Sequence, residues 1–242
     1  MPYTFPRSIL FTASTFGFAS YLTFQNFSKS ALRSIAAVLI ASHSVDVALL
    51  ARVWALEFNG LLRIRLLHKH IPSVLESDTM RFRCWPSLLD FNMHMNNANY
   101  LRLLNYARRR FWSRNGCWAC CVSRTPRVNL IVTASTIRYR REILAFEVFD
   151  VVTRLVTWDT NCMYVEHRFV RPSDSFILAV SLVRYRVVCS DKGLTAGQLL
   201  STIDVTALPN ANAIAPPKPP ELEAWLAYDR CSSNALRPQG VP

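Results

Sequence analysis

The most regular pattern along the chain is helical and covers residues 98–114. Its apolar positions recur at intervals of three and four residues, and arginines fill many of the positions between them. The apolar set comprises Tyr100, Leu101, Leu104, Tyr106, Ala107, Phe111 and Trp112. This spacing predicts a helix with one face buried against a sheet. Asn96 or Asn97, just before it, is a natural N-cap residue.

The rest of the central region is typical of β-strands. A short strand is expected before the helix, over residues 80–85, and four more are expected after it. Those four are rich in β-branched residues or alternate in polarity, and they cover residues 128–139, 146–158, 163–170 and 176–189. Turn-forming residues at 158–161 and 171–175 separate the last three strands.

The order of these elements, a helix and then a meander of strands, predicts an antiparallel sheet packed on that helix, an α+β layout. In the second of the four later strands the apolar positions alternate around Val148, Val152 and Val156. A shorter helical segment is expected at 196–200, and a C-terminal amphipathic helix at 221–230.

Two apolar stretches precede this domain. Between Arg7 and Lys29 lie 21 uncharged residues, and a second stretch covers 35–56. Each approaches the ~20 residues that a helix needs to cross a bilayer, although Asp46 at the centre of the second stretch would be costly in lipid. A membrane anchor, an organelle-targeting presequence and an amphipathic helix on the membrane surface all fit this composition. We favour membrane attachment.

These patterns divide the 242 residues into four parts. Residues 1–57 form an apolar anchor or targeting segment, and 58–79 form a connector. The folded domain covers 80–210, and 211–242 form a proline-rich hinge with the C-terminal helix. The folded part is long enough for one sizeable core.

Composition removes several classes of protein. The chain has only six glycines, from which neither GxGxxG, a P-loop nor GxSxG can be written. Rossmann, P-loop and α/β-hydrolase folds therefore have no support in the sequence. The seven cysteines are odd in number and irregularly spaced, which argues against a disulfide framework. Cys117, Cys120 and Cys121 lack the second pair that a zinc site needs, so we expect no metal and reduced, partly buried thiols.

Positive charge is concentrated around the predicted helix. The net charge is +12, and ten arginines but no acidic residues lie between Asp90 and Glu142. Such a field attracts nucleic acid, an anionic membrane or the phosphates of coenzyme A, although a solvated basic face is the simpler alternative. No recognised nucleic-acid-binding motif accompanies the arginines, so we expect no nucleic-acid partner.

The candidate chemistry lies just before the helix, in the segment DFNMHMNN at residues 90–97. It supplies the carboxylate of Asp90, the imidazole of His94 and three amide side chains. The unpaired amides of the first helical turn point back at this segment. They would polarise a thioester carbonyl, while the carboxylate attacks that carbonyl or activates water. The alternative is that these residues serve only as turn and cap residues.

The string D-x-N-x-H-x-N-N-x-x-Y-L, from Asp90 to Leu101, resembles the signature of the 4-hydroxybenzoyl-CoA thioesterase-like (hotdog) superfamily. Further motifs follow in the order found in its thioesterase superfamily member 6 group: Phe146–Val148, Thr153–Leu155, Trp158–Asp159, Tyr164–Glu166, Arg168–Val170 and Pro219–Leu222. The apolar N-terminal stretch is similar as well, so the resemblance covers residues 35–237.

This resemblance implies a hotdog fold, in which an antiparallel sheet wraps around a long central helix. It implies a homodimer with the acyl-thioester pocket at its interface. It implies no cofactor, because coenzyme A or phosphopantetheine is part of the substrate. By position, Asp90 matches the nucleophile or base of catalytic members, and Asn92 and His94 match residues that help to activate water.

Other positions match the substrate-binding parts of the family. Asn96, Asn97 and Tyr100 match positions that shape the helix start and the pocket. Arg138, Arg140 and Arg141 form a cationic strip at a strand end, which is either a contact for the phosphates of coenzyme A or simply an exposed strand end. One departure is clear: the helix positions that are acidic in several thioesterases are here Asn105 or Arg108.

We therefore expect hydrolysis of an acyl-CoA or acyl-carrier-protein thioester in lipid metabolism. The alternative is a non-catalytic, membrane-attached protein of the same fold that binds acyl thioesters or acts as a scaffold. The membrane of the endoplasmic reticulum is the expected location, with the mitochondrion as the alternative.

Overall fold

A computed structural model describes residues 33–34, 55, 71–190, 193–204 and 214–236. The chain forms two units, 1–52 and 53–242, and almost all described residues belong to the second. The predicted anchor at 1–57 lies almost wholly outside them, so membrane attachment stays a prediction. Within the described ranges, no helix combines the length and apolarity needed to cross a bilayer.

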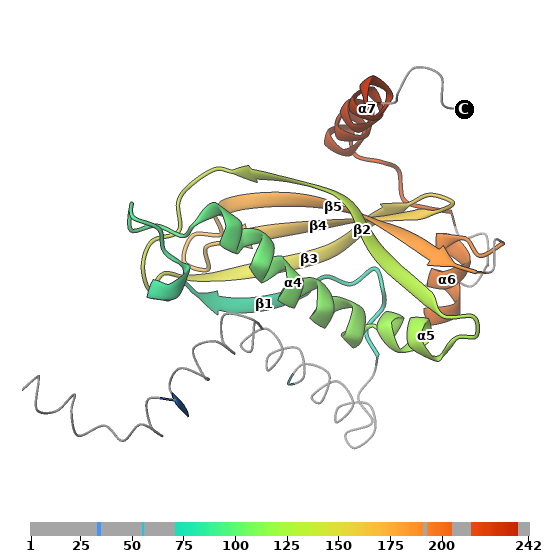
Figure 1. The fold of residues 1–242 in the computed structure, drawn as a ribbon, viewed down its shortest axis with the longest axis horizontal. Helices are drawn as coiled ribbons and strands as arrows, with labels where there is room; N and C mark the ends of the chain where they lie inside the picture. Colours follow the sequence, from blue (N-terminus) through green and yellow to red (C-terminus); the bar gives the residue numbers. More distant parts are fainter. Residues whose placement is uncertain (1–32, 35–54, 56–70, 191–192, 205–213, 237–242) are drawn as a thin grey trace, which may run out of the picture. The chain divides into compact units, whose positions relative to one another are not determined.

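The described part contains five strands and several helices (Figure 1). The strands are β1 Asp78–Arg83, β2 Val128–Tyr139, β3 Val148–Trp158, β4 Cys162–Val170 and β5 Ile177–Cys189. The helices are the 3-10 turn η1 Pro86–Leu88, then α4 Asn97–Arg114, α5 Cys117–Ser123, α6 Ala196–Ile203 and α7 Pro220–Ala235. The long helix and all five predicted strands are confirmed to within two residues at each end. Helix α5 was not predicted, and α6 and α7 are longer than expected.

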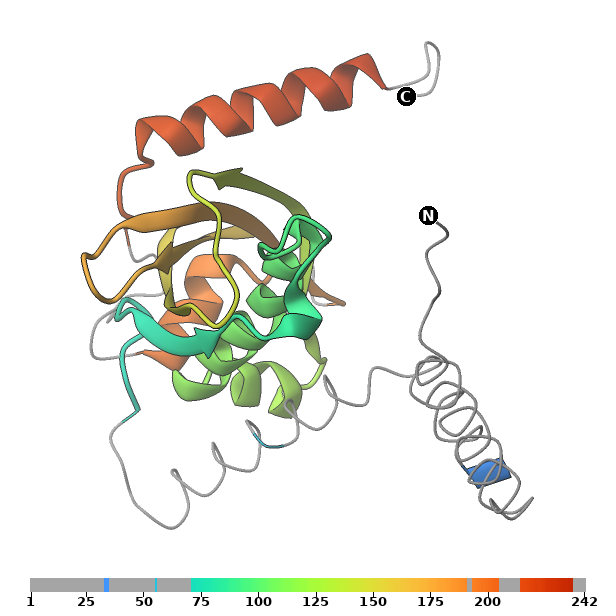
Figure 2. The ribbon, with the colours of Figure 1, turned by 90° about the vertical axis from the view of Figure 1, so that its left-hand side faces the viewer.

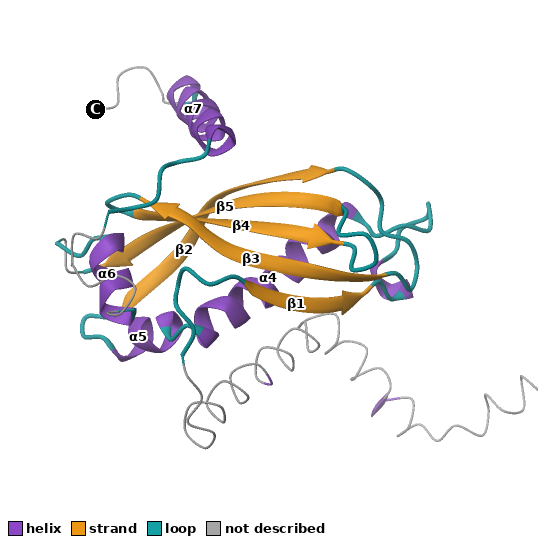
Figure 3. Ribbon diagram, turned by 180° about the vertical axis from the view of Figure 1, so that it is seen from behind, coloured by secondary structure: helices purple, strands orange, loops and turns teal. Residues whose placement is uncertain are grey.

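The five strands form one antiparallel sheet in the order β1-β3-β4-β5-β2. Figure 3 shows that α4 lies along one face of this curved sheet. The predicted α+β hotdog layout is therefore confirmed. The predicted meander of four strands is correct only for β3, β4 and β5. β1 pairs with the other edge of β3, and β2 lies at the opposite edge of the sheet, beside β5.

The buried face of α4 differs from the sequence prediction at two positions. Six of the seven predicted positions are buried, but Leu101 is 43% exposed, and Leu103 is buried instead. In β3 the side chains buried on the face that α4 covers include Phe149, Val151 and Thr153. The alternation read around Val152 therefore marks the opposite face of this strand.

The opposite face of the sheet is partly covered by α7. Leu222 and Leu226 pack on Val156, Tyr164 and Leu182. Figure 2 shows α7 and α4 on opposite sides of the sheet. An ion pair, in which Arg184 Nη1 lies 2.7 Å from Asp229 Oδ2, joins β5 to α7. The final helix is thus a second layer rather than a loose tail.

Helix α5 places the clustered cysteines in the core. Cys117 and Cys121 are buried, and Cys120 is half-buried. All seven thiols of the chain are free of disulfide bonds. The short helix packs beside α4, β2 and α6, where its apolar residues complete the core at that end of the sheet.

A belt of buried polar side chains crosses the middle of the core face. Thr153, His167 and Ser181 lie opposite one another on β3, β4 and β5 and are at most 1% exposed. His167 Nδ1 lies 2.9 Å from Thr153 Oγ1. Burial, with a smaller contribution from the charge of Arg108, lowers the pKa of His167 to about 3.

Replacing His167 with glutamine should flatten the pH dependence of folding stability. Burial keeps this imidazole neutral in the folded chain, whereas an unfolded histidine binds a proton below pH about 6.5. The contribution of the neutral His167 to folding stability is therefore fully present above pH about 6.5. It is lost as the pH falls toward 3. The loss amounts to about 2 kcal/mol between pH 7 and pH 5. Urea unfolding at a series of pH values measures the slope, and equal slopes in both chains would contradict the prediction.

Candidate functional site

Asp90 begins a tight turn that leads into α4. An antiparallel bridge between Leu89 and Met95 closes this turn, and Asp90 N donates to His94 O at 3.0 Å. The carboxylate of Asp90 has contacts at both oxygens. Oδ1 accepts from Asn92 N at 2.9 Å, and Oδ2 lies 3.3 Å from His94 Nδ1. The turn therefore holds a carboxylate and an imidazole side by side.

The Asp90–His94 pair remains reachable from solvent. The side chain of Asp90 is 22% exposed, and that of His94 is 28% exposed. Asn92 is exposed, and it contacts Asp90 through its backbone amide. Of the three predicted catalytic residues, the structure thus brings two side chains together, while the third shapes the turn.

The loop before β3 contacts the second half of this turn, at His94 and Met95. His94 forms an antiparallel bridge with Leu144, and Met95 N donates to Ile143 O at 2.8 Å. Glu147 fixes that loop, because its carboxylate accepts from Leu144 N at 2.9 Å and pairs with Arg171 at 2.8 Å. Glu147 appeared in the sequence only as part of a family motif. Its structural role depends partly on Arg171, which is 24 residues away in the chain.

Asn96 caps the helix that follows. Its side-chain oxygen accepts from Ala98 N at 2.9 Å, and its own amide donates to Leu88 O at 2.9 Å. The N-cap prediction is therefore confirmed for Asn96. Asn99 adds a second tie, because its side chain also donates to Leu88 O. These bonds hold the start of α4, and the positive end of its dipole, against the Asp90 turn.

The two other predicted binding residues of this segment differ in exposure. Asn97 is exposed, and its carbonyl accepts from Tyr139 Oη at 3.1 Å. Tyr100 is only 2% exposed and packs against the rings of Tyr139 and Phe169, each with a centroid distance of 4.9 Å. Burial raises the pKa of Tyr100. Tyr100 thus helps to seat the helix, and Tyr139, which sequence reasoning missed, links it to β2.

The cationic strip lies where β2 ends. Arg140 and Arg141 place their guanidinium carbons 5.0 Å and 4.6 Å from the ring centroid of Phe176. Arg138 is exposed and lies opposite Val180 in the sheet. Because β2 ends where β1 ends and α4 begins, the strip lies at the same end of the sheet as the Asp90 turn (Figure 1).

The helix itself offers no acidic partner for Asp90, as the sequence indicates. Asn105 and Arg108 are both half-buried. Arg108 lies near two buried polar groups, His167 and Tyr185, and influences the pKa of each. The departure from the acidic pattern thus adds a positive charge beside the polar belt of the core.

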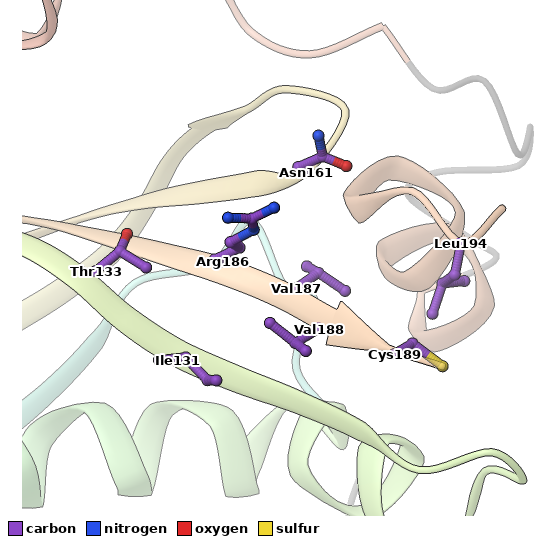
Figure 4. A pocket seen from close by; sticks show the side chains of 8 residues that line it. All are labelled: Ile131, Thr133, Asn161, Arg186, Val187, Val188, Cys189 and Leu194. Carbon is purple, nitrogen blue, oxygen red and sulfur yellow. The ribbon is translucent and has the colours of Figure 1, made fainter. Parts of the chain in front are cut away.

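A cavity of about 520 Å³ lies elsewhere, near the start of β2 and the end of β5 (Figure 4). Its polar groups come from Thr133, Asn161 and Arg186, and Ile131 and Val188 are among its apolar residues. Because the Asp90 turn is at the opposite end of these strands, this cavity does not belong to the candidate site.

The part of the chain that is similar to known proteins includes this site. A profile of the thioesterase-like superfamily matches residues 84–227. Protein THEM6 of Xenopus laevis is 34% identical over 152 residues, which are 63% of this chain and 68% of that protein. Protein THEM6 of Danio rerio is 35% identical over 167 residues, 69% and 77% of the two chains. The solved structure of YbaW, a probable thioesterase from Escherichia coli, is similar with a TM-score of 0.43 and 19% identity, covering 52% of this chain and 94% of that one.

Proposed function

This chain belongs to the thioesterase-like superfamily, and on that basis we propose that it hydrolyses the thioester of an acyl-CoA or of an acyl carrier protein. The observation that carries the proposal is the Asp90–His94 pair on a turn that leads directly into the N-terminus of α4. Such a turn puts a base beside a region of positive potential. The acyl group is proposed to be a lipid chain.

In the proposed reaction Asp90 acts as general base. It takes a proton from water while the water oxygen bonds to the thioester carbonyl carbon. The carbonyl oxygen gains negative charge, which a first-turn amide of α4 stabilises. Asn96 already occupies the amide of Ala98, so the amide of Asn97 is the candidate donor. The carbon–sulfur bond then breaks, and the proton held by Asp90 passes to the leaving thiolate.

His94 has a positioning role in this scheme. Its Nδ1 lies beside Asp90 Oδ2, while the Asn92 amide binds Oδ1. Two contacts on two oxygens restrict rotation of the carboxylate. Direct attack by Asp90 on the carbonyl, with an acyl-enzyme anhydride that water then cleaves, uses the same geometry.

Replacing Asp90 with asparagine should lower kcat at least ~10²-fold, because the amide cannot accept the proton. The side-chain oxygen of the replacement would still accept from the Asn92 amide, so the turn should persist. Asp159→Asn is a matched control, since Asp159 Oδ1 accepts from Asn161 N in the same kind of turn at the other end of the sheet. The measurement is steady-state hydrolysis of a panel of acyl-CoAs by the full chain.

Equal activity of the two variants would remove Asp90 from the mechanism. Binding of acyl-CoA by the unaltered chain, with no turnover at any acyl length, would instead favour the non-catalytic acyl-thioester-binding alternative.

We propose that Arg140 and Arg141 bind the phosphates of coenzyme A. Both side chains are exposed at the site's end of the sheet, and guanidinium groups suit phosphate oxygens. Arg171, which also lies over Phe176, is already paired with Glu147 and Asp174. Arg140 and Arg141 are therefore the two cations over Phe176 that are proposed to receive an incoming anion.

The double change Arg140→Gln and Arg141→Gln should raise KM for acyl-CoA about tenfold, as expected for loss of two exposed charge contacts. It should leave KM for the matching acyl-N-acetylcysteamine thioester unchanged, because that thiol carries no phosphate. Arg127→Gln, an exposed arginine just before the start of β2, is the control. A parallel rise for both thiols would contradict phosphate recognition.

We also propose that the chain forms a homodimer through β2. This strand lies at the edge of the sheet, and among the described strands only β5 pairs with it. An exposed edge of 12 residues is a template for pairing with another chain. Its side chains support this use, because Ile131, Val132 and Tyr139 are each more than one third exposed.

A charge in this edge should weaken the dimer. Val132→Glu is expected to raise the dissociation constant at least tenfold, because it buries a carboxylate in the interface. Tyr228→Glu, on the exposed side of α7, should have no effect. Sedimentation equilibrium measures both. A dimer unaffected by Val132→Glu would place the interface elsewhere.

A further inference from the structure

One flank of α4 runs from the candidate catalytic turn into the core. Its members recur at intervals of three and four residues, so they lie above one another on the helix. We call this set the helix stripe: Asn97, Leu101, Asn105, Arg108 and Trp112. The first two members are exposed, the next two are half-buried, and the last is only 3% exposed. The stripe therefore leads inward from the helix start that borders Asp90.

The inner end of the stripe meets buried polar atoms that lack partners. Neither Trp112 Nε1 nor Tyr185 Oη forms a well-aligned hydrogen bond within the described part of the chain. Their rings meet edge to face, with centroids 5.7 Å apart. His167 leaves its Nε2 in the same state, although its Nδ1 contacts Thr153. Buried polar atoms in proteins are nearly always hydrogen-bonded, so these exceptions need an explanation.

Arg108 adds a positive charge to this group. Burial raises the pKa of Tyr185 to about 12, and the charge of Arg108 opposes that rise. The same charge contributes, after burial, to the low pKa of His167. Among the described residues no carboxylate pairs with Arg108, and the Asp78 carboxylate, which contacts α4, is bound to Arg110 and Arg114. A half-buried cation beside unpartnered donors favours an anionic ligand.

We propose that Arg108 and Tyr185 bind a carboxylate at the far end of the acyl group, so that the preferred ligand is the thioester of an acyl chain with a terminal carboxylate. The inference rests on the thioester-binding function proposed above and names its substrate class. With the thioester carbonyl at the Asn97 amide, the acyl chain would follow the helix stripe inward. The guanidinium of Arg108 suits the two oxygens of a carboxylate.

The helix stripe also sets the length of this acyl chain. From Asn97 to Arg108 an α-helix rises about 16 Å. Long side chains on helices point back toward the N-terminus, so the Arg108 side chain covers part of that distance. The terminal carboxylate would then lie roughly ten carbons from the thioester carbonyl. The expected ligand is therefore a medium-length chain.

A second copy of the chain, paired through β2 as proposed above, would not neutralise Arg108. The carbonyl of Asn97 accepts from Tyr139 of β2, and Trp112 contacts Tyr185 of β5. Both ends of the stripe thus lie on the side of the sheet where β2 forms the edge. The chain between Asp90 and Glu142, which includes α4 and β2, contains no acidic residue. Pairing through β2 brings no carboxylate from either element and leaves the charge of Arg108 for a ligand.

Binding of two coenzyme A thioethers to the full chain tests the proposal. Both carry a chain of roughly ten carbons, which ends in a methyl group in one and in a carboxylate in the other. A thioether is not hydrolysed, so the comparison does not depend on turnover. Arg108→Gln removes the charge, and Tyr185→Phe removes only the hydroxyl. Arg109→Gln is the matched control, because Arg109 is also half-buried on α4 but lies 3.5 Å from the ring centroid of Trp118.

In calorimetry the unaltered chain should bind the carboxylate-ended thioether about tenfold more tightly than the methyl-ended one. Arg108→Gln should abolish this preference, Tyr185→Phe should reduce it, and Arg109→Gln should retain it. If Arg108→Gln does not fold, an unchanged preference in Tyr185→Phe decides against the proposal.

Equal binding of both thioethers by the unaltered chain would overturn the carboxylate site and leave the proposed hydrolysis standing. A preference that persists in Arg108→Gln, or that Arg109→Gln removes as well, would also overturn it, because overall charge would then explain the result. Failure to bind either thioether would overturn the thioester-binding function together with this inference.

Discussion

The packing of α4 against the curved sheet is the interaction on which the rest of the structure depends. Tyr100, Leu104 and Phe111 are nearly fully buried along it, and side chains of this size contribute about 1.5–3 kcal/mol each when buried. Near its other end, the buried Asp78 of β1 pairs with Arg110 and Arg114. The helix is thus fixed along its whole length, which sets where its N-terminus lies.

That position determines the candidate site. Asn96 ends the loop by capping α4, and Leu88 accepts from both Asn96 and Asn99. The chain between Leu88 and Asn96 has no freedom to run elsewhere, so it folds into the turn that brings Asp90 beside His94. The loop before β3 closes it from the other side. The backbone bonds from Leu88 and from the loop before β3 therefore hold the turn in which the Asn92 amide and His94 Nδ1 contact the carboxylate.

The same constraint explains why apolar side chains remain exposed there. The core face of the sheet is filled by α4, α5 and α6, and the other face receives α7. The loops at the α4 N-terminus lie beyond both layers, so among the described elements none buries Phe91 or Met93. Arg83 borders these side chains, since its guanidinium carbon lies 6.0 Å from the ring centroid of Trp85.

The sequence by itself predicted the long helix, the five strands and the segment proposed to carry the chemistry, but not α5. The bounds of α4 and of the later strands follow from periodicity, and the cap at Asn96 follows from local bonding, because both depend on neighbours within a few residues. Only the tertiary structure decided that β2 pairs with β5, that Phe149 rather than Val152 faces the helix, and that Leu101 is exposed. These depend on partners distant in the chain. The pairing of Asp90 with His94 stands between the two cases, since the spacing permits it and the enclosing loops enforce it.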